Sequence, residues 1–280
     1  MYTNIQTRTT SDQKGASCAE MPFPDTPRVI YDRNPLEEVI CQLKFPPILK
    51  IDSESPASFQ DGIRRTYPFF QEIPGVLIDV PSEIVKMLPA LAGTKSYSFE
   101  SPERSWKVTL NREFVALSTT AYVRWEDFRA RLITVLDALE RHYQPTFFLR
   151  VGLRYRDVIR PSCLGIESVQ WTALLKPWIL GELSQEAIAP YIKQATGDVL
   201  ITLNGETGQV RLRHGLVQPT DQSETIYSID CDFYREGTTE RRNVIELLNV
   251  YNKEAGRLFR WCISDELSAR LGPRPVAAAQ

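Results

Sequence analysis

Residues 147–160, with the sequence FFLRVGLRYRDVIR, constrain the fold more than any other stretch of the chain. Apolar and charged side chains alternate along it, which indicates a β-strand, because successive side chains of a strand point to opposite faces. The apolar face carries Leu149, Val151, Leu153, Tyr155 and Ile159. The charged face carries Arg150, Arg154, Arg156 and Arg160. We therefore expect a long strand with one face against a core and a row of arginines on the other.

Shorter strands are predicted on both sides of this central strand. Those before it cover residues 39–45, 76–80, 96–99, 106–110 and 114–119. Those after it cover residues 188–194, 199–204, 210–213 and 225–234. The turns at 111–113 and 204–208 are short enough for hairpins, so neighbouring strands are expected to run antiparallel.

Two long amphipathic helices are also predicted, at residues 125–143 and 240–259. The first has apolar residues at helical spacing: Trp125, Phe128, Leu132, Val135, Leu136, Leu139 and Tyr143. Ser55 and Pro56 are typical of a helix start, and Ser264 is typical of the cap of a last short helix. Another helical region is expected at residues 169–183, with a break at Pro177.

The order of these elements repeats along the chain. Residues 28–145 and residues 146–272 each contain a strand, a helical segment, several antiparallel strands and a long helix. We therefore predict an α+β fold in which curved antiparallel sheets carry long helices on one face, with a possible pseudo-twofold duplication. Two independent domains are disfavoured because residues 143–147 contain no linker rich in Gly, Pro or Ser. Residues 1–27 are expected to form a disordered or loosely attached arm, and residues 273–280 a frayed tail.

The composition is that of a soluble globular protein, with 42% hydrophobic and 24% charged residues. A formal net charge of -2 argues against a protein that coats nucleic acid along its whole surface, but it allows a local basic patch. The five cysteines are scattered without a CxxC pair, and this favours reduced thiols in the cytoplasm. No apolar run is long enough to cross a membrane, and no targeting segment is visible.

Several kinds of active site are disfavoured by the residues present. Only two histidines occur, so a histidine-based metal site or a Ser/His/Asp triad is not expected. No glycine-rich phosphate loop and no zinc-protease or nucleophile-elbow motif is found. We expect no cofactor and no catalytic residue.

Short motifs resemble those of a sporadically distributed, uncharacterised bacterial family of about 250 residues. One is the N-terminal NP-x-x-E-[hydrophobic] pattern that ends in [RK]F, and another is the central VGLRY at 151–155. The matching residues include Asn34, Pro35, Glu38, Phe45, Tyr122, Trp125 and Phe128. The family usually has an asparagine after the central motif, where this chain has Arg156 and Asp157. The resemblance implies a place in mobile or defence-associated loci, such as toxin–antitoxin or antiphage cassettes, and it implies no activity.

The arginine row is the strongest functional signal in the sequence. Together with Arg211 and Tyr155, the residues Arg150, Arg154, Arg156 and Arg160 are candidates for binding an acidic protein partner, or phosphates and bases of nucleic acid. The structural alternative is that acids such as Asp230 and Asp232 on a neighbouring strand pair with these arginines.

Two further sets of residues are weaker candidates. Asp230 and Asp232 share a strand face and are weak candidates for a Mg²⁺ site, the alternative being a solvated strand face. Trp171, Trp178 and Trp261 are possible interface residues, because tryptophan is frequent at the centre of protein interfaces, the alternative being the core.

Taken together, these features favour a non-enzymatic protein-binding subunit of the bacterial cytoplasm. It is predicted to be an accessory, regulatory or antitoxin-like subunit of a defence or toxin–antitoxin system. Its partner is expected to be encoded by a neighbouring gene, and homo-oligomers are expected. The first alternative is a nucleic-acid-binding component that uses the arginine face, and the second is a Mg²⁺-dependent nuclease at Asp230 and Asp232.

Overall fold

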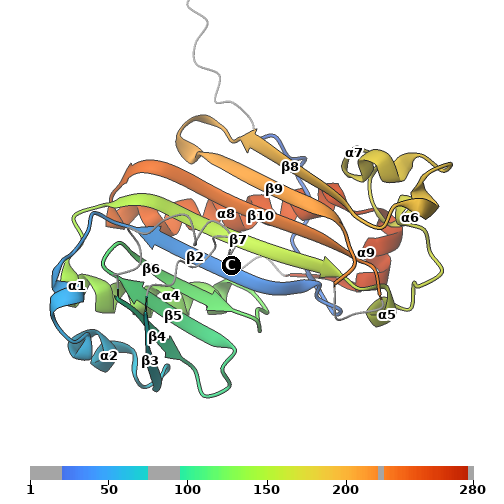
Figure 1. Cartoon of the computed structure of the whole chain (residues 1–280). Helices are drawn as coiled ribbons and strands as arrows, with labels where there is room; N and C mark the ends of the chain where they lie inside the picture. Colours follow the sequence, from blue (N-terminus) through green and yellow to red (C-terminus); the bar gives the residue numbers. More distant parts are fainter. Residues whose placement is uncertain (1–20, 75–94, 220–223, 277–280) are drawn as a thin grey trace, which may run out of the picture.

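A computed structural model describes residues 21–74, 95–219 and 224–276. Nine strands form one antiparallel sheet (Figure 1). Their order across the sheet is β3 (Phe69–Pro74), β4 (Lys95–Glu100), β5 (Trp106–Asn111), β6 (Phe114–Thr119), β2 (Leu36–Lys44), β7 (Phe148–Ile159), β10 (Ile226–Thr239), β9 (Gln209–Val217) and β8 (Ala195–Thr202). The predicted α+β class is confirmed, and the predicted central strand is β7, which lies beside the middle strand β2.

The two predicted halves meet at the pairing of β2 with β7 in the middle of this sheet. In the first half, β2 is followed by the short helices α1 (Lys50–Ser53) and α2 (Ala57–Ile63), the strands β3 to β6 and the long helix α4 (Trp125–Tyr143). In the second half, β7 is followed by short helices, the strands β8 to β10 and the long helix α8 (Arg241–Cys262). The same order of elements therefore occurs on each side of the β2–β7 seam.

Both long helices lie on the same face of the sheet (Figure 1). The apolar stripe of α4 is buried from Trp125 to Leu139, and Gln144 ends the helix in the left-handed conformation. The stripe of α8 is buried from Val244 to Cys262. The indole Nε1 of Trp125 donates a 2.8 Å hydrogen bond to Oδ1 of Asn249, so the start of α4 is tied to the middle of α8.

Alternation along β7 separates a core face from a charged face, as predicted. Val151, Leu153 and Tyr155 are buried beneath the helices, whereas the arginines are only partly exposed on the opposite face. The start of the strand differs from the prediction, because Leu149 is exposed and Phe148 is buried against Phe45. The register between β7 and β10 shifts at this end, and such a bulge changes which face a side chain takes.

Residues 169–183 are helical with a break at Pro177, as predicted, whereas the strand predicted at 188–194 is wrong. The predicted helical region is divided into α6 (Trp171–Leu174), α7 (Pro177–Leu180) and a 3₁₀ turn, because Pro177 cannot continue a helix and Gly181 has a positive φ. The predicted strand at 188–194 is a short 3₁₀ helix (Ala189–Tyr191) followed by an irregular segment, since Pro190 has no N–H to donate to a sheet. The strand predicted at 76–80 lies outside the described residues.

The described parts of both chain ends contact the helix face. β1 (Val29–Tyr31) pairs with β11 (Pro273–Pro275), which follows the short helix α9 (Asp265–Leu271). Phe23 is buried against Trp261, although residues 1–27 were predicted to form a loose arm. Residues 1–20 of that arm and residues 277–280 of the predicted tail lie outside the described residues. No helix within the described ranges is long and apolar enough to cross a bilayer.

Candidate functional sites

The arginine face of β7 is paired with acids of the neighbouring strand β10. Arg154 donates two 2.7 Å hydrogen bonds to the carboxylate of Asp230. Arg150 donates a 2.8 Å bond to Asp232 and a 3.3 Å bond to Gln42 of β2, and its guanidinium lies over the ring of Tyr234. The acids predicted as the structural alternative therefore neutralise the centre of the row.

The rest of the predicted row is paired in the same way. Arg156 lies 3.3 Å from a carboxylate oxygen of Glu37 and 3.8 Å from one of Glu38, and Arg160 also pairs with Glu37. Arg211 on β9 pairs with Asp198 on β8 at 2.6 Å. A phosphate would therefore have to displace a carboxylate at each of these arginines. The other residue of this predicted site, Tyr155, lies on the opposite face under the helices.

The same pairing accounts for the predicted metal-site residues. Asp230 and Asp232 each accept hydrogen bonds from an arginine, so their negative charge is already compensated. No cluster of three or more His, Cys, Asp or Glu side chains suited to a metal is found among the described residues.

The residues of the N-terminal motif tie the β2–β7 seam together. The side chain of Asn34 accepts a hydrogen bond from the backbone N–H of Leu36 and donates one to the carbonyl oxygen of Tyr122. The carbonyl oxygen of Pro35 accepts a 2.8 Å bond from the backbone N–H of Val158. Phe45 is in the core. These contacts describe a structural role for the motif, together with the bond from Trp125 to α8.

The three predicted interface tryptophans separate into two environments. Trp178 and Trp261 stack with ring centroids 4.4 Å apart, and Nε1 of Trp178 donates to the carbonyl oxygen of Trp261. Both remain partly exposed at one corner of the molecule. Trp171 instead packs against the buried ring of Tyr227, so it belongs to the edge of the core.

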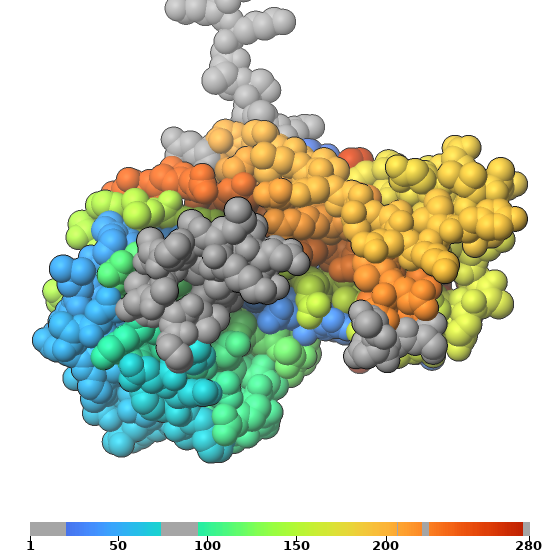
Figure 2. All heavy atoms as spheres, in the orientation of Figure 1, coloured from blue at the N-terminus to red at the C-terminus, as the bar shows by residue number. Residues whose placement is uncertain are grey.

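Strand β8 forms an exposed edge of the sheet next to this corner (Figure 1). We call β8 and the preceding residues 178–191 the β8 flank. Its exposed large apolar side chains are Trp178, Ile188, Tyr191, Val199 and Leu200. Figure 2 shows this flank, coloured yellow to orange, as one outer margin of the molecule. Sequence analysis missed the edge, because strand order is not readable from the sequence.

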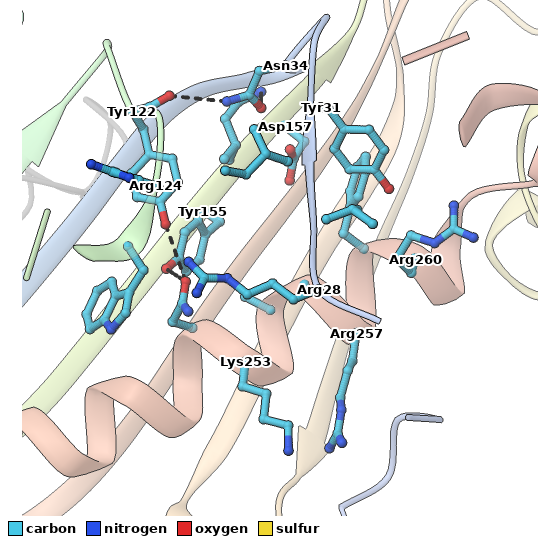
Figure 3. Close-up of a pocket in the computed structure, with 18 of the residues that line it drawn as sticks. Arg28, Tyr31, Asn34, Tyr122, Arg124, Tyr155, Asp157, Lys253, Arg257 and Arg260 are labelled. Atoms are coloured by element: carbon cyan, nitrogen blue, oxygen red, sulfur yellow. Dashed lines mark hydrogen bonds between the residues drawn. The ribbon is translucent and has the colours of Figure 1, made fainter. Parts of the chain in front are cut away.

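A cavity of about 440 Å³ lies on the helix face at the β2–β7 seam (Figure 3). Its floor includes Tyr155 and Asp157 of β7, and one wall is α8 from Asn252 to Arg260. The chain segment 26–31, which we call the N-terminal strap, forms another wall. The hydroxyl groups of Tyr122 and Tyr155 both lie within hydrogen-bond distance of Oδ1 of Asn252, at 3.3 and 3.0 Å.

Asp157 is the unusual residue of this cavity. It is only 5% exposed, and no described residue is hydrogen-bonded to its carboxyl group. Burial raises the pKa of Asp157 well above its ordinary value, and the nearby charge of Asp230 adds to this effect. Burial therefore favours the neutral form of Asp157, which occupies a position of the apolar face of β7.

Charged residues at the rim of the cavity are mostly paired. Arg28 of the strap donates 2.6 and 2.8 Å hydrogen bonds to the carboxylate of Glu126, and these bonds lower the pKa of Glu126 to about 2. Arg124 pairs with Asp127, and Arg257 pairs with both Glu254 and Asp25. Lys253 makes no ion pair with a described residue. Three residues around the cavity were not predicted as site residues from the sequence, namely Asp157, Asn252 and Lys253. Asp157 could have been noticed, because it is an acid at an apolar position of the alternating strand 147–160.

A scan against protein-family models and a search of curated proteins find no match to this chain. The resemblance noted from the N-terminal and central motifs therefore stays a prediction.

The burial of the arginine pairs predicts that two of them contribute differently to the free energy of unfolding. Removal of Arg154 leaves Asp230 without its bidentate partner, and the side chains of this pair are only 16% and 12% exposed. We expect Arg154→Ala to lower the free energy of unfolding by about 3 kcal/mol, measured by urea denaturation at pH 7. Arg211→Ala is the matched control, because Arg211 and Asp198 are 46% and 45% exposed, and it should cost clearly less than Arg154→Ala. Equal small losses would contradict a structural role for the central pair.

The raised pKa of Asp157 predicts a pH dependence of stability. Because the folded-state pKa is above the unfolded value of 3.8, the folded protein loses stability relative to an uncharged variant as pH rises from about 4. We expect Asp157→Asn to be more stable than the parent at pH 7 by at least about 1 kcal/mol, with the difference closing toward pH 4.

Urea denaturation between pH 4 and pH 8 measures this difference. Asp198→Asn is the control of opposite sign, because a hydrogen bond from Arg211 lowers the pKa of Asp198, and its contribution is lost as pH falls. If the free energy of unfolding of the parent rose relative to that of Asp157→Asn with increasing pH, Asp157 would be ionised in the folded protein and the prediction would be wrong.

Proposed function

We propose that this chain is a non-enzymatic accessory or regulatory subunit that binds another protein through the β8 flank. The observation that carries the proposal is that, among the described residues, no strand pairs with the outer edge of β8. Its sequence, ATGDVLIT, contains neither lysine nor proline, and its single charged residue, Asp198, is paired with Arg211. Natural edge strands are usually protected against pairing by charges, prolines or bulges, so an edge without them is suited to a partner.

The side chains of the flank favour the same kind of binding. A partner strand that adds to β8 gains main-chain hydrogen bonds, and side chains that flank the edge supply specificity. Tyr191 is 82% exposed and Leu200 is 57% exposed, and both lie in the flank. Aromatic anchors such as Tyr191 and Trp178 are typical of the centres of interfaces.

The two alternative functions have less support. Nucleic-acid binding through Arg150, Arg154, Arg156 and Arg160 requires cations that are free to meet phosphates, and the central arginines hold carboxylates instead. A nuclease at Asp230 and Asp232 requires carboxylates free to hold Mg²⁺, and both are committed to arginines. The assignment to a defence or toxin–antitoxin system rests on the resemblance alone and stays a prediction.

The proposal is tested with Leu200→Lys, which places a charge on the exposed edge. We expect at least a tenfold loss of affinity for the product of the adjacent gene, measured by co-expression, size-exclusion chromatography and titration of the purified components. The fold should be kept, because Leu200 is exposed. Tyr191→Ala tests the same flank without changing the strand.

Leu49→Lys is the matched control, since Leu49 is 68% exposed and precedes α1 in the other half of the molecule. It should leave the complex unchanged. A complex that tolerates both Leu200→Lys and Tyr191→Ala would contradict the proposal. A complex formed only between copies of this chain would contradict a heteromeric partner and identify β8 as a dimer contact.

A further inference from the structure

The cavity at the seam is built from parts of the chain that are distant in sequence. The strap, the start of β2, the turn before α4, the floor strand β7 and helix α8 all contribute to its lining (Figure 3). A volume of about 440 Å³ is within the range of small-molecule sites, which is roughly 300–1,000 Å³. This cavity is on the helix face, so it is separate from the charged face of the sheet.

The side chain of Asp157 is buried by the fold but lines the cavity. Figure 3 shows it directed from β7 toward the strap that carries Arg28 and Tyr31. A buried polar group without a hydrogen bond destabilises a protein by roughly 1–3 kcal/mol, so buried polar groups are normally paired. Asp157 lacks such a partner among the described residues, and it lines an open cavity. Its position is therefore suited to a partner that enters from outside.

In the neutral form, which burial favours, the carboxyl group of Asp157 selects a particular kind of partner. It presents one O–H donor beside one carbonyl acceptor. The complementary group has an N–H donor beside an acceptor on one edge, as in the lactam and amidine edges of nucleobases. A pair of parallel hydrogen bonds to such an edge would satisfy both oxygens of Asp157.

The remaining walls of the cavity fit a flat ring. Aromatic side chains on several sides of the cavity are those of Tyr31, Tyr122, Trp125, Tyr155 and Phe259. The rings of Tyr122 and Tyr155 meet edge to face with centroids 5.8 Å apart, and their hydroxyl groups are directed to Asn252. Their ring surfaces are thus held in fixed positions, as is typical of sites for planar apolar groups.

The cationic side chains at the rim of the cavity favour a ligand that carries a negative charge. Arg28 and Arg124 pair with Glu126 and Asp127, and Arg257 pairs with Glu254 and Asp25. None of these acids is among the lining residues. Lys253 lines the cavity as well and forms no ion pair with a described residue. An anionic group at the rim would therefore meet the ammonium group of Lys253, whose charge also acts on Asp25 and Glu254.

We infer that this cavity binds a nucleotide-like small molecule, whose base pairs with the carboxyl group of Asp157 and whose phosphate lies at the rim near Lys253. This site is independent of the β8 flank, so the inference stands apart from the proposed protein-binding function. The protein would then be a binding subunit with a second site for a small ligand.

The inference is tested by calorimetric titration of the full chain with AMP, GMP, CMP and UMP, and with the four corresponding nucleosides. We expect at least one of the nucleotides to bind, and its nucleoside to bind at least threefold more weakly. Asp157→Leu should weaken the binding of that nucleotide at least tenfold, because leucine provides no hydrogen bond. Asp157→Asn should stay within about threefold of the parent, because an amide also presents a donor beside an acceptor.

Two further variants separate the parts of the site. Lys253→Met should weaken the nucleotide and leave the nucleoside unchanged, whereas Lys193→Met, in the segment before β8, should change neither. Thermal denaturation of each variant checks that it is folded, and Asp157→Asn keeps the test valid if Asp157→Leu does not fold. Absence of binding by all eight compounds at millimolar concentration would overturn the inference. So would binding that is equal in the parent and in a folded Asp157→Leu.

Discussion

The pairing of β2 with β7 is the contact on which the rest of the structure depends. It joins two halves with the same order of elements into one nine-stranded sheet, and it places both long helices on one face. Val39, Cys41, Leu43, Val151 and Leu153 are fully buried along it. Because these side chains all lie on one face, a slip of one residue would expose all of them, and the register is strongly specified.

The far face of the same seam has the opposite chemistry. Its arginines form ion pairs with carboxylates of the neighbouring strands, and these ion pairs make up one network across the sheet. Replacing such a network by apolar residues is often neutral for stability, whereas breaking one partner is costly. The arginine face thus contributes to the pairing of particular strands, and the surfaces suited to ligands lie elsewhere, at the β8 edge and in the cavity under the strap.

Alternation and helical spacing were sufficient to predict the central strand, the two long helices and the α+β class. They were insufficient where local residues mislead, as at Ile188 and Ile192, whose spacing resembles a strand although Pro190 interrupts it. The partners of the arginines depend on strand order, and the sequence does not reveal that β10 lies beside β7. Asp157 was visible as an acid on the apolar face, but its significance depends on the cavity, which is formed by six separate segments.

Native-state hydrogen exchange tests the central claim that both halves form one cooperative unit. The slowest amides of β2, from Val39 to Leu43, and those of β7, from Val151 to Tyr155, should exchange with the same free energy. That value should equal the free energy of global unfolding, since the slowest core amides open only when the whole unit unfolds. If the amides of one half exchange at a clearly lower free energy while those of the other half stay protected, the halves are independent domains and the account is contradicted.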